Sequence, residues 1–320
     1  MLRPLQNLFD PQQHPQLLAG LSAPDDAAVW QLDDERALIL TTDFFTPVVD
    51  TPYDYGAIAA ANSLSDVYAM GGVPFLALNV AALPPDLPED LSAEIILGGA
   101  HTLRESGAVL AGGHTVQDKE PKFGYVVAGF CHPQHVLTKG GAQPKDVLLL
   151  TKPLGTGCIT TALKRNLADP TDLSEAVGWM KRLNAKAGLL ARTFGATAAT
   201  DITGFGLLGH ASEMAQASQV ALHLQFDQIP LLRGARRYAE DWIFPGGSSD
   251  NRVNFGNLVT FAPQIDEALQ MLLFDAQTSG GLLFSLPPEN LPALRQRAAA
   301  LGQPVWQIGR VTSGSGIFIE

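Results

Sequence analysis

The stretch Ala61-Asn-Ser-Leu-Ser-Asp-Val-Tyr-Ala-Met-Gly-Gly72 completes a segment, residues 55–70, whose apolar side chains recur at helical spacing. The stripe consists of Ala57, Ala60, Leu64, Val67 and Tyr68. The two glycines that follow are a typical stop signal for a helix. Asn62 and Asp66 lie four residues apart, so they share the helix face opposite the stripe. This face is either an ordinary solvated surface or a pair of oxygen ligands for a metal or phosphate.

Three further acidic stretches contain carboxylates beside small or hydroxyl residues. They are Asp25-Asp26-Ala-Ala-Val29, Thr41-Thr-Asp43-Phe-Phe and Thr200-Asp201-Ile-Thr-Gly-Phe-Gly206. A single such Asp more often caps a turn than binds a ligand. Together, the four stretches indicate oxygen ligands for Mg²⁺, which needs only one or two protein carboxylates per ion and usually binds with phosphate. They therefore predict more than one ion, neutralising phosphate oxygens during phosphoryl transfer.

The order of patterns predicts two α/β (α+β) domains. Residues 28–40 read as strand, turn and strand, and Asp43 is expected where the second strand ends. Further strands are expected at 75–82, 108–111, 125–130 and 147–151, and further helices at 91–106, 173–194, 207–218 and 291–301. The predicted organisation is an N-terminal segment (1–22), a first domain (23–132), a linker (133–144) and a second domain (145–320).

Several glycine-rich stretches are candidate phosphate sites. Ala111-Gly-Gly113-His114-Thr115 reads as a buried strand that breaks into a glycine turn, whose backbone N–H groups and Thr hydroxyl could hold phosphate. No GxxxxGK[ST] motif occurs, so ATP would bind without a P-loop. Lys152-Pro-Leu-Gly-Thr-Gly157 and Asp275-Ala-Gln-Thr-Ser-Gly-Gly281 are phosphate-binding or structural turns, and the structural interpretation is favoured.

One motif points to a different fold. Gly204-Phe-Gly-Leu-Leu-Gly209 matches the GxGxxG of dinucleotide folds, with Asp227 at the spacing of a ribose-binding acid. The residues before it make a poor hydrophobic strand, and Asp201 just ahead of the glycines would repel a pyrophosphate. We therefore do not favour this interpretation. His210 and the other histidines lack metal-ligand spacing and receive no role.

Composition narrows the class of protein. The 320 residues carry a net charge of −11 with a pI near 5.0, which disfavours a nucleic-acid partner. The two cysteines form no CxxC motif, so neither a disulfide scaffold nor a thiolate zinc site is indicated. No apolar run approaches the ~20 residues needed to span a membrane, and the first residues do not resemble a signal peptide. A cytoplasmic protein is expected.

Taken together and in order, these motifs closely resemble selenophosphate synthetase (selenide, water dikinase). The resemblance runs from about Pro11 to the C-terminus. It implies a PurM-like architecture with a dimerising N-terminal domain, hence a homodimer, and conversion of ATP, selenide and water to selenophosphate, AMP and phosphate. By motif match, the Mg²⁺ ligands would be Asp26, Asp43, Asp66 and Asp201. Asp43 and Asp66 would also contact the nucleotide, as would Asn62 by its helix face, while Gly113, His114 and Thr115 would line the phosphates across the dimer interface.

The chain departs from the family at one point. Family members carry a glycine-rich segment with a Cys or selenocysteine and an essential Lys ahead of the first Asp-Asp, but the residues before Asp25 contain neither. The first Lys is Lys119, and the first Cys is Cys131, expected to be a buried structural thiol. We therefore assign no catalytic residue and expect the chain to bind Mg-ATP but turn over poorly. The alternatives are a non-catalytic or truncated Mg-ATP-binding homologue, or another PurM-like ATP enzyme with a different acceptor.

Overall fold

The computed structural model describes residues 13–21 and 25–320, so most of the expected N-terminal segment 1–22 lies outside the described part. The chain divides into two compact units. Unit 1 runs to Thr138 and includes Leu183–Gly188, and unit 2 comprises Lys139–Arg182 and Leu189–Glu320. The division after Thr138 falls within the stretch 133–144 that the sequence marks as a linker.

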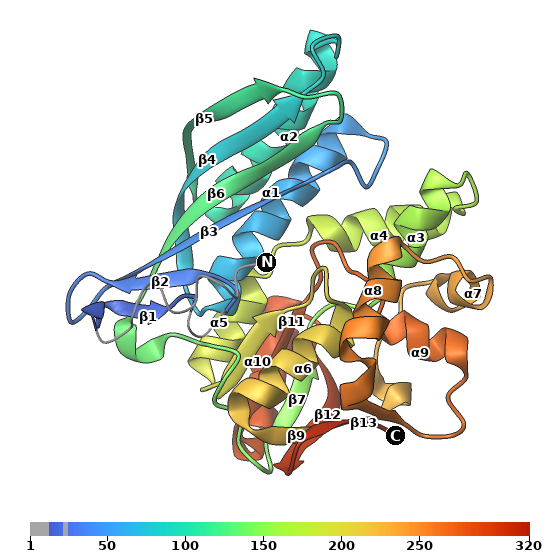
Figure 1. The fold of residues 1–320 in the computed structure, drawn as a ribbon. Coiled ribbons are helices and arrows are strands. Elements are labelled where there is room, and N and C mark those ends of the chain that lie inside the picture. Colours follow the sequence, from blue (N-terminus) through green and yellow to red (C-terminus); the bar gives the residue numbers. More distant parts are fainter. Residues whose placement is uncertain (1–12, 22–24) are drawn as a thin grey trace. The chain divides into compact units, whose positions relative to one another are not determined.

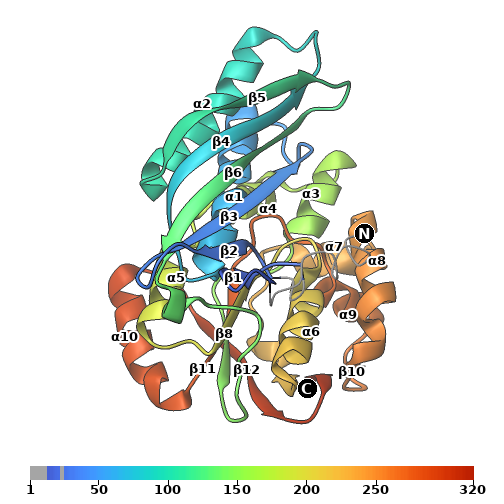
Figure 2. The ribbon, with the colours of Figure 1, turned by 60° about the vertical axis from the view of Figure 1, so that its left-hand side comes forward.

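Unit 1 is built on a six-stranded sheet with the order β1-β2-β3-β6-β4-β5. The strands are β1 (Leu17–Ala19), β2 (Ala28–Gln31), β3 (Ala37–Phe45), β4 (Val73–Leu83), β5 (Val109–Gln117) and β6 (Lys122–Cys131). All neighbouring strands are antiparallel except β4 and β5. Helices α1 (Pro52–Ala69) and α2 (Glu89–Ser106) cover one face of this sheet (Figures 1 and 2).

Helix α1 is buried along its length rather than on one stripe. Every residue from Tyr55 to Ala69 is buried, because α1 lies between the sheet and α2. Glycines let the two helices approach closely: a Cβ on Gly56 would overlap the carbonyl oxygen of Ile95, and one on Gly98 would overlap that of Tyr53. The solvated face considered for Asn62 and Asp66 is therefore wrong, since both side chains are inside the unit.

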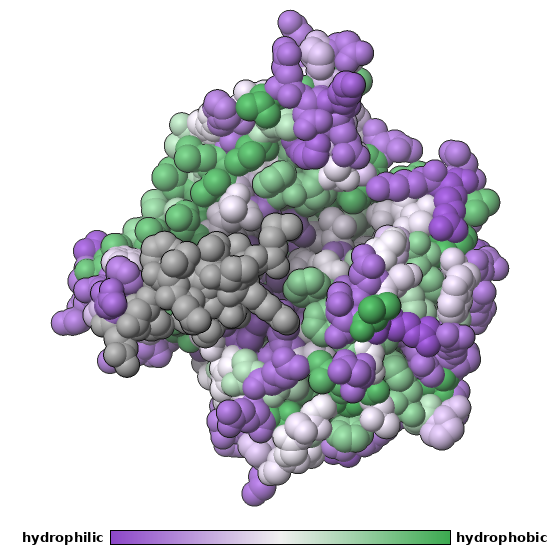
Figure 3. All heavy atoms as spheres, in the orientation of Figure 1, coloured by the Kyte–Doolittle hydropathy of each residue, from purple (hydrophilic) through white to green (hydrophobic). Residues whose placement is uncertain are grey.

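The other face of the unit 1 sheet is apolar and exposed. On β3 the side chains alternate, so Ile39 is fully buried against the helices while Leu40 is 45% exposed. Phe75 and Phe130 stack at 4.4 Å on neighbouring strands. The large exposed apolar side chains of these strands are Trp30, Leu40, Phe44, Val73, Phe75, Leu78, Val109 and Val116. Figure 3 shows apolar side chains gathered over this sheet, and we call this surface the apolar sheet face.

Unit 2 contains a seven-stranded mixed sheet with the order β10-β13-β9-β12-β7-β11-β8. The strands are β7 (Val147–Leu150), β8 (Ala198–Asp201), β9 (Val220–Leu224), β10 (Val259–Phe261), β11 (Leu282–Leu286), β12 (Trp306–Ser313) and β13 (Gly316–Ile319). Its helices are α3 (Thr156–Lys164), α4 (Pro170–Lys181), α6 (Gly206–Ser218), α7 (Ala235–Glu240), α8 (Gly246–Phe255), α9 (Glu267–Leu273) and α10 (Leu291–Leu301), while α5 (Ala185–Thr193) begins in the part of the chain assigned to unit 1. Short 3-10 turns are η3 (Pro133–His135), η4 (Phe226–Gln228), η5 (Gly256–Leu258) and η6 (Pro288–Asn290).

The topology excludes a dinucleotide fold around Gly204–Gly209. The preceding strand β8 runs antiparallel to its neighbour β11, whereas the dinucleotide motif requires parallel strands joined by a helix. The expectation that the residues before the motif make a poor strand was wrong, because residues 198–201 form a fully buried strand. The two-domain α/β architecture itself is confirmed. No helix in residues 13–21 and 25–320 is long and apolar enough to cross a membrane.

Candidate Mg-nucleotide site

The structure brings Asp43, Asn62 and Asp66 together between β3 and α1. Thr41 and Asp43 are two residues apart on β3, so their side chains share a sheet face, and Asn62 and Asp66 are one turn apart on α1. The Thr41 hydroxyl donates to Asp66 Oδ2 at 2.5 Å, and the Asn62 amide donates to Asp43 Oδ2 at 2.5 Å. Sequence reasoning missed the role of Thr41, which the two-residue alternation on β3 could have revealed.

The electrostatics of this array favour a bound cation. Burial raises the pKa of Asp43 to about 6, and the hydrogen bond from Asn62 opposes that rise only partly. Asp66 is only 8% exposed. Both carboxylates accept hydrogen bonds from neutral groups, which orient them without neutralising their charge. Because an ionised buried carboxylate is costly unless a positive group balances it, two such groups make an oxygen-rich site for a metal ion.

Asp26 lies in a bend two residues before β2, the strand next to β3. The antiparallel register of β2 and β3 ends at the pair Ala28 and Leu40, so Asp26 precedes the paired part of the strand. The backbone N–H of Asp26 is bonded to the side chain of Asp25 at 2.9 Å. Asp43 itself is not at the end of a strand as expected, because β3 continues to Phe45.

Gly113, His114 and Thr115 lie elsewhere on the same sheet. The expected glycine turn is wrong: residues 109–117 form one continuous and mostly exposed strand, β5, at the edge of the sheet. Two strands, β6 and β4, lie between β3 and β5. At the usual strand spacing, β3 and β5 are therefore about 14 Å apart. Within one chain, these three residues are therefore not beside Asp43 and Asp66, and their contact with phosphates stays a prediction.

Asp201 is placed in unit 2, at the end of β8, where it is 2% exposed. Lys152, which the sequence marked only as the first residue of a glycine-rich turn, is buried and interacts electrostatically with Asp201. Burial lowers the pKa of Lys152 to about 7, and the charge of Asp201 opposes that shift. The Lys152 ammonium donates to the backbone oxygen of Ser279 at 2.7 Å. A lysine two residues after the apolar run Val147–Leu150 was the available sequence signal for its burial.

The two glycine-rich turns of unit 2, residues 152–157 and 275–281, are hydrogen-bonded to each other. This agrees with their interpretation as structural turns. Asp275 Oδ2 accepts the backbone N–H groups of Gly157 and Cys158 at the start of α3. Gln277 Oε1 accepts the N–H and the hydroxyl of Thr156. The donors that a phosphate would need at this helix terminus are therefore already used by protein groups. Burial and the nearby Asp275 raise the pKa of Cys158 well above its ordinary value, so this thiol is inert.

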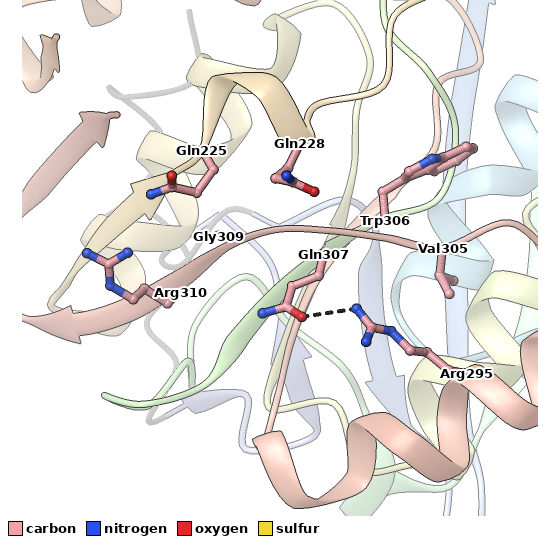
Figure 4. A pocket seen from close by; sticks show the side chains of 8 residues that line it. All are labelled: Gln225, Gln228, Arg295, Val305, Trp306, Gln307, Gly309 and Arg310. Atoms are coloured by element: carbon pink, nitrogen blue, oxygen red, sulfur yellow. Dashed lines mark hydrogen bonds between the residues drawn. The ribbon is translucent and has the colours of Figure 1, made fainter.

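Unit 2 contains a cavity that is separate from these residues. This cavity of about 460 Å³ lies between β12, η4 and α10, as Figure 4 shows. Arg295 donates to Gln307 at 3.1 Å across it, and Arg310 is bonded to Glu320. None of the predicted site residues lines this cavity. In the described ranges, no three His, Cys, Asp or Glu side chains form a ready-made metal cage, which is compatible with Mg²⁺, since that ion keeps waters and phosphate oxygens as ligands.

Family models match both units. The AIR synthase related protein N-terminal domain matches residues 24–131, and the corresponding C-terminal domain matches residues 143–320. Curated relatives align over most of the chain and most of their own length. A selenide, water dikinase of Caldanaerobacter subterraneus subsp. tengcongensis is 48% identical over 88% of this chain and 81% of its own. Selenide, water dikinase 2 of Peptoclostridium acidaminophilum is 46% identical over 97% and 88%, and the enzyme of Carboxydothermus hydrogenoformans is 43% identical over 99% and 91%.

Solved structures share the fold at lower identity. Thiamine-monophosphate kinase from Stenotrophomonas maltophilia K279a superimposes with a TM-score of 0.71 at 22% identity, covering 99% of this chain and 94% of that one. Hydrogenase maturation protein HypE in complex with ATP gives a TM-score of 0.65 at 19% identity, covering 89% and 79%. The two matching domains and the relatives aligned over most of their length place this chain in the selenide, water dikinase family of AIR synthase related proteins.

Proposed function

We propose that this protein is a selenophosphate synthetase that converts ATP, selenide and water to selenophosphate, AMP and phosphate. One observation carries the proposal: Asp43 and Asp66, two of the carboxylates in the family-like motifs, are oriented by hydrogen bonds between β3 and α1, in a chain 42–48% identical to selenide, water dikinases. We also propose a cytoplasmic site of action.

Within unit 1, Asp43 and Asp66 are the proposed ligands of Mg²⁺, and Asp26, two residues before β2, is proposed as a further ligand. The donor set fits, because hard carboxylate oxygens in a partly dehydrated site are what Mg²⁺ takes as ligands. When bound, the ion would offset the negative charge of the ATP phosphates. Asn62 orients one carboxylate, and Thr41 orients the other. Asp201 is the proposed metal ligand of unit 2.

A second candidate function is a Mg-ATP-binding homologue that does not carry out the selenium step. One observation favours it: both cysteines of the chain are buried, at 8% and 0% exposure. A third candidate is an ATP enzyme of the same fold with a different phosphoryl acceptor, which would release ADP rather than AMP.

Product analysis separates the three candidates. The protein is incubated anaerobically with ATP, Mg²⁺ and selenide and followed by ³¹P NMR. Selenophosphate with AMP supports the synthetase, and ADP supports a different acceptor. Calorimetric ATP binding without any product supports the homologue that only binds. Absence of ATP binding by the folded protein contradicts all three, and D43N serves as the control expected to weaken Mg²⁺-dependent ATP binding.

We also propose that two copies of unit 1 associate through the apolar sheet face. A face this rich in exposed aromatic and aliphatic side chains marks an interaction site, and a two-fold dimer lets one surface serve both partners. The placement of Gly113, His114 and Thr115 supports a second copy as the occupant. In such a dimer we expect these residues of one copy to reach the nucleotide bound beside Asp43 of the other copy.

Light scattering after gel filtration tests the dimer. The wild-type protein is expected at twice the 34.0 kDa of one chain. Replacing Leu40 and Phe44, 45% and 52% exposed, by Glu places charges on the face and should yield monomers. V253E, at an 82% exposed side chain of α8, is the matched control and should leave the mass unchanged. A wild-type monomer at micromolar concentration contradicts the proposal.

A further inference from the structure

The loop after Asp201 is held by a histidine for which the sequence suggested no role. Residues 202–205 connect β8 to α6, and His210 lies one turn into α6. Its ring is buried at 5% exposure and turns back toward the loop. His210 Nε2 accepts the backbone N–H of Thr203 at 3.2 Å and lies 3.3 Å from the Thr203 hydroxyl. The histidine therefore fixes a backbone group two residues after Asp201.

His210 can serve as an acceptor because it is held neutral. Burial and, to a smaller extent, the charge of Lys139 lower the pKa of His210 to about 3. Since the Thr203 N–H donates to Nε2, the ring hydrogen is assigned to Nδ1. That atom lies 3.7 Å from Glu213 Oε2, which accepts a hydrogen bond from Lys139 at 2.9 Å. Lys139 and Glu213 thus set the charge environment on the far side of the ring.

The same loop is anchored on its other side by backbone contacts. The Thr203 oxygen accepts the N–H groups of Gly206 and Gln277 at 2.9 and 3.0 Å. Ile202 donates to the Gly281 oxygen at 2.8 Å. With these contacts in place, the bond to His210 leaves the peptide between Ile202 and Thr203 a single orientation. Asp201 is the residue just before this peptide, so the direction of its side chain depends on the orientation of the peptide.

We propose that His210 is a positioning residue for metal binding at Asp201: by accepting the Thr203 N–H, it fixes the loop that aims the Asp201 carboxylate. This inference rests on the proposed function, because it takes Asp201 as a Mg²⁺ ligand. His210 touches neither metal nor substrate in this role. Mutating a residue that orients a metal ligand typically lowers metal affinity by 10–100-fold. His210 acts on Asp201 through the backbone, so we expect a loss at the lower end of that range.

Two conservative variants separate positioning from packing. In H210Q, the longer side chain can bring its amide oxygen to the place of Nε2 and keep the acceptor. In H210N, the Asn side chain is one carbon shorter than that of Gln. It stays polar but cannot reach the Thr203 N–H. H223N is the matched control, since His223 pairs with Glu320 at 2.6 Å, away from this loop. Metal binding is measured by Mn²⁺ paramagnetic resonance with a non-hydrolysable ATP analogue, and loop order by hydrogen exchange of the Thr203 amide.

For H210N we expect about a tenfold weaker Mn²⁺ affinity and faster exchange at Thr203, with H210Q and H223N close to wild type. Affinity of H210N equal to that of wild type overturns the inference, provided that D201N does weaken binding. If H210N does not fold, H210Q decides, because a tenfold loss in that variant overturns the acceptor role and retained affinity supports it. If the wild-type protein binds no Mn²⁺, or D201N leaves the affinity unchanged, the metal role of Asp201 in the proposed function fails, and the inference falls with it.

Discussion

Replacing Asp43 by Asn should make the metal-free protein more stable, and more so at high pH. The folded protein raises the pKa of this carboxyl from 3.8 to about 6 through burial. Between those values, the folded state binds more protons than the unfolded state, so stability falls as pH rises through this window. The ionised carboxylate is therefore a cost that the folded protein bears at neutral pH, and the amide of D43N removes it.

The size of the effect follows from the shift. At 1.36 kcal/mol per pKa unit, ionising Asp43 costs at most about 3 kcal/mol at pH 8 and about 1.6 kcal/mol at pH 5. The advantage of D43N over wild type should thus grow by about 1.4 kcal/mol between these two pH values. Partial exposure of the side chain to solvent reduces both costs. The Asn62 amide can still donate to the oxygen of the new side chain, so packing is little changed.

Urea denaturation with EDTA present, followed by tryptophan fluorescence at pH 5 and pH 8, measures this difference. D34N, in the exposed turn between β2 and β3, is the control for removing one negative charge. Addition of Mg²⁺ and an ATP analogue should stabilise the wild-type protein more than D43N, which inverts the order of stability. If D43N is not more stable than wild type, or if the difference in unfolding free energy is the same at both pH values, the ionised Asp43 carboxylate does not destabilise the metal-free protein. This result would refute the reasoning.

Two further predictions concern packing and the thiols. G56A should destabilise the protein by about 3 kcal/mol in urea unfolding, because its Cβ overlaps the Ile95 backbone. In contrast, G178A, in an exposed part of α4 with open space around it, should stabilise it by about 0.5–1 kcal/mol; equal effects of the two would contradict the close contact between α1 and α2. Cys131 and Cys158, 8% and 0% exposed, should not react with a thiol reagent such as Ellman's until denaturant is added, and rapid labelling of the native protein would show that one of them is accessible after all.

Local patterns predicted most elements of secondary structure correctly. Residues 55–70 form a helix that the structure extends to Pro52–Ala69, and the predicted helix 291–301 has the observed bounds. The predicted helix 173–194 is instead two helices, α4 and α5. The glycine turn at 111–115 was wrong for a clear reason: a parallel neighbour, β4, holds these glycines in an edge strand, and pairing between distant segments is invisible to a local pattern.

For the candidate site, too, the sequence predicted one part and only the tertiary structure decided the other. The sequence alone identified the family and predicted Asp26, Asp43, Asp66 and Asp201 as Mg²⁺ ligands, because residue type and motif order determine ligand chemistry. Only the tertiary structure decided which of them meet. Packing of α1 against β3 joins residues about twenty positions apart and raises the pKa of Asp43. Folding of unit 2 likewise made His210 an acceptor for Thr203 and used Asp275 to cap α3. Burial and hydrogen-bond partners depend on what surrounds a side chain in space, and that is set by the fold as a whole.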